Sequence, residues 1–234
     1  MFEADTKDAE PQVEQMLSYR VDGVLLMSAN LTSALSARLN DNGIPTVLMN
    51  RRDLNKSNPS VVADNRKGGA AIAHHLSERG YENFAYVAGL RSSSTNRDRP
   101  GGVLSALKKL GHAPAHLIAG EYDPDIACAA VRYFLQATDK RIDALFIAND
   151  HMACAVLDML RFELKLKVPR DIAVVGFDDI PTASRHSYAL TTYSQPVEAM
   201  VDQAIDLLMG RIENPERYFE TRVVPGELII RKTT

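Results

Sequence analysis

The chain has 234 residues and a formal net charge of −3, so its charge does not indicate binding to nucleic acid. It has no apolar run near the roughly 20 residues of a membrane span, and its acidic start (MFEADTKDAEPQ) lacks the apolar core of an export signal. Cys128 and Cys154 each stand alone within helical patterns, which favours reduced thiols and a cytoplasmic protein.

Apolar segments rich in β-branched residues alternate along the chain with segments of helical periodicity. The predicted strands are residues 23–28, 45–49, 60–63, 83–88, 116–119, 143–148 and 172–177. The predicted helices are residues 9–20, 31–42, 66–79, 101–110, 125–137, 151–163 and 197–212. Strands that are apolar throughout are typical of parallel sheets that helices cover on both faces. The sequence therefore predicts an α/β doubly wound chain.

Polar residues follow four consecutive predicted strands. They are Ser93, Thr95 and Arg99 after strand 83–88, Tyr122 after 116–119, Asn149 after 143–148, and Asp178 with Asp179 after 172–177. Each alone could be a helix cap or a solvated turn residue, because Asp, Asn and Ser are common caps. Ligands of such sheets bind beyond the carboxyl ends of the strands. Four polar strand ends together are better explained by a polar binding site.

Motifs for catalysis and cofactors are missing from the sequence. It has no G-x-G-x-x-G after an early strand, no G-x-x-x-x-G-K-[ST] and no G-x-S-x-G. Pro114 stands between His112 and His116, so these two histidines do not share a helical face for a metal. Asp178 and Asp179 are chain neighbours, whereas acid–base pairs usually come from separate elements. We therefore expect neither an enzyme nor a cofactor.

Eight segments follow one another in register: VDGVLLMS, GIPTVLMNRR, VVADNRKGGAAIAHHLSERGYENFAYVAG, RDRPGGVLSALKKLG, FIANDHMACAVLDML, VPRDIAVVGFDDI, LTTYSQP and LIIRKTT. Together they resemble the effector-binding domain of LacI/GalR-family transcriptional regulators, from about residue 5 to the end. The resemblance implies a periplasmic-binding-protein-like fold of two Rossmann-like subdomains with the effector in the cleft between them. The expected subdomains are residues 1–64 plus 194–222 and residues 65–193 plus 223–234.

The resemblance also implies which residues bind the effector. Asp178 is expected to accept hydrogen bonds from effector hydroxyl or amine groups, and Arg99 to hold a ring oxygen, hydroxyls or a carboxylate. Asp179 is expected to cap the short helix that follows it. The remaining expected ligand-binding residues are Ser93, Thr95, Tyr122, Asn149, Asn50 and Gln195. Side chains of this kind favour a sugar over a purine as the effector.

Family members begin with a helix-turn-helix, a first strand and a first helix, all of which this sequence lacks. The resemblance therefore implies an incomplete N-terminal subdomain and operator DNA contact only through a helix-turn-helix absent from this chain. It also implies a homodimer, for which helix 151–163 offers Met152, Val156 and Met159, with Cys154 near the dimer axis. The alternative is a periplasmic sugar-binding protein of a transporter, which has the same fold; VVGFDDI and IIRKTT favour the regulator.

Overall fold

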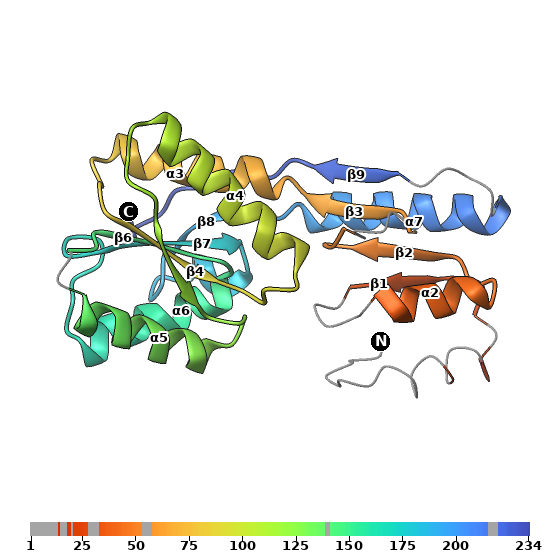
Figure 1. Cartoon of the computed structure of the whole chain (residues 1–234), viewed down its shortest axis with the longest axis horizontal. Coiled ribbons are helices and arrows are strands. Elements are labelled where there is room, and N and C mark those ends of the chain that lie inside the picture. Colours follow the sequence, from red (N-terminus) through yellow and green to blue (C-terminus); the bar gives the residue numbers. More distant parts are fainter. Residues whose placement is uncertain are drawn as a thin grey trace. The chain divides into compact units, whose positions relative to one another are not determined.

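A computed structural model describes residues 14, 18–19, 21–27, 33–52, 58–138, 141–214 and 220–234. The predicted helix 9–20 lies largely outside these residues. The chain divides into two compact units (Figure 1). Unit 1 is Met1–Ala63 with Pro196–Val224, and unit 2 is Asp64–Gln195 with Pro225–Thr234.

Unit 1 contains a parallel four-stranded sheet in the order β1-β2-β3-β9. The strands are β1 (Val24–Leu26), β2 (Thr46–Met49), β3 (Ser60–Ala63) and β9 (Thr221–Val224), and the helices are α2 (Ser33–Asp41) and α7 (Val197–Glu213). Successive side chains of a strand point to opposite faces of the sheet. Accordingly Val47 and Met49 of β2 pack in one cluster with Leu207 of α7, whereas Leu48 packs against a second cluster that contains Leu39 of α2. The two helices therefore cover opposite faces.

Unit 2 contains a six-stranded sheet in the order β10-β8-β7-β6-β4-β5, in which only the short β10 is antiparallel. The strands are β4 (Phe84–Ala88), β5 (His116–Ala119), β6 (Ala144–Ile147), β7 (Ala173–Asp178), β8 (Thr191–Ser194) and β10 (Leu228–Ile229). The helices are α3 (Asn65–Glu78), α4 (Ser94–Lys109), α5 (Pro124–Ala137), α6 (Asp150–Asp158) with its π-helical extension η1 (Met159–Glu163), and the 3-10 helix η2 (Pro181–Ser184). Helices α3 and α4 lie on one face of the sheet and α5 and α6 on the other (Figure 1). The predicted α/β class with parallel sheets is confirmed.

Helix α4 begins at Ser94, well before the predicted start at residue 101. The side chain of Ser93 caps it by accepting a hydrogen bond from Asn96 N at 3.4 Å, and Pro100 lies within the helix. The polar composition and the proline made this segment look like a loop. Because residues four apart share a helix face, Thr95 and Arg99 are placed on one side of α4 rather than in a loop.

The apolar residues of α6 and η1 that were expected to face a dimer partner are buried within unit 2. Met152 and Val156 are 0% exposed, Met159 is 2% exposed and Cys154 is 7% exposed. That part of the dimer prediction is wrong, because these side chains fill the core between α6 and the sheet. The exposed large apolar residue of this segment is Phe162.

Candidate functional site

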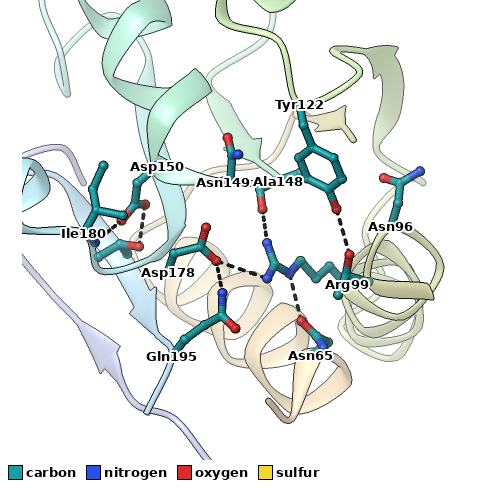
Figure 2. Close-up of polar contacts among 12 residues, drawn as sticks. Asn65, Asn96, Arg99, Tyr122, Ala148, Asn149, Asp150, Asp178, Ile180 and Gln195 are labelled. Atoms are coloured by element: carbon teal, nitrogen blue, oxygen red, sulfur yellow. Dashed lines mark hydrogen bonds and ion pairs between the residues drawn. The ribbon is translucent and has the colours of Figure 1, made fainter. Parts of the chain in front are cut away.

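Polar side chains gather at one edge of the unit 2 sheet, beyond the carboxyl ends of its parallel strands (Figure 2). Ser93 and Thr95 follow β4, Tyr122 follows β5, Asn149 and Asp150 follow β6, Asp178 ends β7, and Gln195 follows β8. Strands β8, β7, β6, β4 and β5 are neighbours in this order. The candidate site is therefore built by five adjacent strand ends, which is where ligands of such sheets bind.

The carboxylate of Asp178 is held through one of its two oxygens. Oδ1 accepts hydrogen bonds from Nη2 of Arg99 at 3.1 Å and from Nε2 of Gln195 (Figure 2). Within the described part of the chain, no hydrogen bond reaches Oδ2. Burial raises the pKa of the Asp178 carboxyl, and the nearby positive charge of Arg99 acts in the opposite direction. The protein thus orients this half-buried carboxylate through Oδ1, and the described residues donate no hydrogen bond to Oδ2.

Arg99 is fixed on several sides at once. Its Nε donates to Oδ1 of Asn65 at 2.8 Å, its Nη1 donates to the carbonyl of Ala148, and its side chain is 3% exposed. The guanidinium carbon lies 3.7 Å from the centroid of the Phe177 ring. Three of its five N–H groups thus have protein acceptors, one of them Asp178, and its expected role in holding the effector stays a prediction.

A chain of hydroxyl groups lies beside this ion pair. The hydroxyls of Ser93 and Thr95 are 2.6 Å apart, and that of Thr95 is 2.8 Å from Tyr122 Oη. Tyr122 has a left-handed backbone with φ 60°, and its ring lies against Gly89. A Cβ atom on Gly89 would lie 2.0 Å from Tyr122 Cζ, so only glycine leaves room for the ring.

Asp150 is a fully buried acceptor next to the site, with 0% exposure. Its Oδ1 accepts from the Thr192 hydroxyl at 2.7 Å, and its Oδ2 accepts from the backbone N of Ile180 at 3.0 Å. Burial raises the pKa of Asp150 to about 7; the Thr192 hydrogen bond lowers it, and the charge of Asp178 raises it further. This residue was not predicted from the sequence, although it directly follows Asn149 at the end of β6.

Asp179 does not cap the helix after it, contrary to the prediction. The N-cap of η2 is Ile180, and no side-chain hydrogen bond caps this helix. Asp179 has φ 55°, whereas a capping residue usually has an extended backbone. Its Oδ1 instead forms an ion pair with Nη2 of Arg231 at 2.7 Å.

Two predicted asparagines have different surroundings. Oδ1 of Asn149 accepts from Met152 N at 3.0 Å, so this side chain caps α6 while lying at the candidate site. Asn50 belongs to unit 1, where it follows β2 with φ 58°. Its Oδ1 is buried, and the described residues supply no hydrogen-bond partner for it. The structure therefore brings the other seven predicted residues to one edge of unit 2, and the role of Asn50 stays a prediction.

Sequence reasoning missed several residues that support the site. Asn65, Phe177 and Thr192 contact Arg99 or Asp150, and Asn96 accepts a hydrogen bond from Gly89 N at 2.8 Å. The place of Asp150 directly after a predicted strand was a signal that could have identified it, and Asn96 lies only seven residues from Gly89. The contacts of Asn65, Phe177 and Thr192 join residues far apart in the sequence. In the described residues, no group of three or more potential ligands could hold a metal ion. No described helix has the length and apolar character needed to cross a membrane.

Known proteins resemble this chain over most of its length. The profile of the periplasmic binding protein-like domain family matches residues 73–234. The HTH-type transcriptional repressor PurR of Erwinia tasmaniensis is 32% identical over 225 residues, which are 94% of this chain and 65% of that protein. The chain thus spans slightly less than two thirds of that relative.

Solved structures give the same picture. A complex of the transcriptional regulator CelR with cellobiose has 30% sequence identity and a TM-score of 0.88, covering 96% of this chain and 69% of that one. A LacI family transcriptional regulator from Enterococcus faecalis V583 with bound ribose has 25% identity and a TM-score of 0.84, covering 98% of this chain and 83% of that one. These similar proteins are transcriptional regulators, which does not favour the alternative of a transporter's binding protein.

Proposed function

Since this chain belongs to the effector-binding domains of LacI-family transcriptional regulators, we propose that it binds an uncharged, hydroxyl-rich effector, a sugar. The observation that carries the proposal is the half-buried carboxylate of Asp178, which is oriented through Oδ1 and open at Oδ2. An ionised carboxylate only accepts hydrogen bonds, so its open oxygen suits a ligand that donates through hydroxyl groups. Charge-assisted hydrogen bonds of this kind are stronger than neutral ones.

The hydroxyl chain supports the same class of ligand. Ser93, Thr95 and Tyr122 present hydroxyls that donate or accept as their hydrogens rotate. Sugar hydroxyls have the same dual character, so such a row of groups can be matched by neighbouring hydroxyls of one ring. The half-buried ring of Tyr122 adds an apolar surface against which a sugar ring can pack.

The arrangement of charges argues against an anionic effector. Arg99, the buried guanidinium of the site, is paired with Asp178 and donates to Asn65 and Ala148. A second guanidinium, that of Arg231, is paired with Asp179. A phosphate or carboxylate ligand would meet carboxylates whose positive partners are already engaged, and repulsion between like charges would weaken its binding.

In the full regulator, effector binding would change the affinity for operator DNA, which a helix-turn-helix outside this chain would contact. The protein would act in the cytoplasm as a binding module and not as an enzyme.

We also propose that it forms a homodimer through unit 2, where Phe162 of η1 is 68% exposed and Tyr133 of α5 is 75% exposed. Light scattering at high micromolar concentration tests this, and a monomer there contradicts it.

Calorimetry on the wild-type chain tests the proposed ligand class. The probes are cellobiose, D-ribose, adenine as a purine and glucose 6-phosphate as an anionic sugar. We expect binding of at least one neutral sugar, accompanied by a higher unfolding temperature, because a ligand of the folded state stabilises it. Binding of adenine or of the phosphorylated sugar alone would contradict the proposal.

A further inference from the structure

The chain turns sharply where β7 ends, and it does so through two residues with unfavourable backbone angles. Asp178 has φ 119° and Asp179 has φ 55°. Positive φ angles are uncommon for residues other than glycine and persist only where the surrounding structure holds them. The corner Asp178–Ile180 therefore needs fixed partners, and it carries the carboxylate of the proposed effector site.

Asp150 supplies such a partner from a different element. Its two oxygens accept from the backbone N of Ile180, at the end of the corner, and from Thr192 on the neighbouring strand β8. A Cβ atom on Gly176 would lie 2.0 Å from Asp150 Oδ1, so the glycine in β7 makes room for this carboxylate. Asp150 is the first residue of α6, where the helix dipole favours a negative charge.

We propose that Asp150 is a positioning residue that holds the corner Asp178–Ile180 and thereby aims Asp178 Oδ2 at the effector. The orientation of Asp178 toward the effector rests on the proposed function, whereas the hydrogen bonds that hold the corner are present in the chain without ligand. The contacts fit this role, because one fully buried carboxylate connects the start of α6, the corner and β8.

Asp150 has several ionisable neighbours, and its protonation state can be followed at the amide of Ile180. Asp178 and Asp179 face it from the end of β7 and are paired with Arg99 and Arg231, respectively. Cys154 interacts with it from within α6. Ionisation of Asp150 changes the charge 3.0 Å from the Ile180 amide nitrogen, so the chemical shift of that amide reports on Asp150 directly.

Hydrogen exchange of the full chain without ligand tests the hold on the corner. In Asp150→Ala, we expect the amides of residues 178–180 to exchange at least about tenfold faster, as one lost charged hydrogen bond allows. In Asp150→Asn, exchange should stay within about threefold of wild type, because the amide oxygen can accept from Ile180 N while its NH2 donates to Thr192. The matched control is Asp143→Ala, which removes a carboxylate that accepts from Glu82 N and Asn83 N at the other edge of the sheet. Unchanged exchange in Asp150→Ala, or equal acceleration at the corner in Asp143→Ala, overturns the proposal.

Affinity for cellobiose or D-ribose, whichever wild type binds, tests whether Asp150 orients Oδ2 of Asp178 toward the effector. We expect Asp150→Ala to bind about tenfold more weakly, while Asp150→Asn and Asp143→Ala stay within about threefold of wild type. Wild-type affinity in Asp150→Ala contradicts the positioning role. If wild type binds neither sugar, the proposed sugar effector fails, while hydrogen exchange still decides whether Asp150 holds the corner.

A gentler variant covers the case in which Asp150→Ala does not fold. Thr192→Val keeps the side-chain shape and removes the hydroxyl that lowers the pKa of Asp150. The pH midpoint of the Ile180 amide shift should therefore move upward relative to wild type, and it should be missing in Asp150→Asn. A midpoint unaffected by both substitutions overturns the proposal.

Discussion

The two edges of the unit 2 sheet use carboxylates in opposite ways. At the amino ends of the strands, Asp143 precedes β6 and accepts from the neighbouring backbone nitrogens of Glu82 at 3.2 Å and Asn83 at 2.9 Å. At the carboxyl ends, Asp150 is fully buried, and Asp178 is held through one oxygen by Arg99. One edge therefore closes turns near the surface, whereas the other positions charges with partners from distant parts of the chain.

Positive φ angles are also more frequent at the carboxyl edge of the unit 2 sheet than at its amino edge. Glu121, Tyr122, Asp178 and Asp179 have positive φ and lie at the carboxyl ends, whereas Lys165 and Ala189 are the described non-glycine residues of unit 2 with positive φ that precede strands. Such angles cost free energy and cluster at active sites and ligand-binding sites. The carboxyl edge therefore combines less favourable backbone angles with the hydroxyl and carboxylate groups of the candidate site.

The largest expected effect on stability comes from Arg99→Met. This substitution leaves the carboxylate of Asp178 without its ion pair and removes the donors to Asn65 and Ala148. We expect the free energy of unfolding to fall by about 3 kcal/mol, as for other broken buried ion pairs, measured by urea denaturation. The control is Arg132→Met, whose pair with Glu163 is exposed and should contribute less than about 1 kcal/mol. Equal losses in the two variants would remove the distinction between buried and surface pairs.

Asp178→Ala should have the largest effect on ligand binding. Charged hydrogen bonds contribute roughly 1.5–3 kcal/mol each, so affinity for the sugar should fall on the order of ten- to a few hundredfold. Calorimetry measures the affinity, and circular dichroism checks that the fold is retained. Asp143→Ala, at the amino edge, should bind as wild type does; a similar loss there would mean that the two edges do not differ in function.

Much of the fold was predictable because burial on both faces leaves a clear pattern in the sequence. The strand predicted at residues 83–88 is β4, and the one predicted at 172–177 is β7. Strand β8 was not predicted, because its polar Thr191 and Thr192 are buried only through tertiary contacts, among them the hydrogen bond to Asp150. Short polar strands of this kind lack the apolar composition on which the prediction depends.

The candidate site was predictable in its location but not in its pairings. Polar residues after parallel strands must meet at one edge, and seven of the predicted residues do so in unit 2. The contact of Arg99 with Asn65 and the ion pair of Asp179 with Arg231 join residues far apart in sequence. No local pattern encodes such contacts, because they follow from how helices and the C-terminal segment pack on the sheet.

The pH dependence of stability gives the next test of the difference between the two edges of the unit 2 sheet. The pKa of Asp150 rises from 3.8 to about 7 on folding, so the folded state holds the proton more tightly. The contribution of Asp150 is therefore greatest below pH 4 and is lost as the pH rises to about 7. Between pH 5 and pH 8, we expect wild type to lose about 2 kcal/mol more unfolding free energy than Asp150→Asn. The raised pKa of Asp178 acts in the same direction and the lowered pKa of His75 in the opposite one, and both remain in the variant. Urea denaturation at both pH values measures the difference, and parallel profiles would contradict the assignment.

The smallest effect is expected for Asp179→Asn, which tests whether every carboxylate at the carboxyl edge serves the ligand. The side chain of Asp179 is 27% exposed, and its partner Arg231 also donates to the carbonyl of Leu190 at 2.8 Å. Because a partly exposed pair is screened by solvent, its loss should lower the free energy of unfolding by no more than about 1 kcal/mol. Asparagine also tolerates the left-handed backbone at this position, so the corner should keep its shape. Affinity for the sugar should stay within about threefold of wild type, since the open oxygen of Asp178 is untouched. If Asp179→Asn instead lowers affinity by more than about tenfold while Asp178→Ala binds as wild type does, Asp179 and not Asp178 is the residue that contacts the effector.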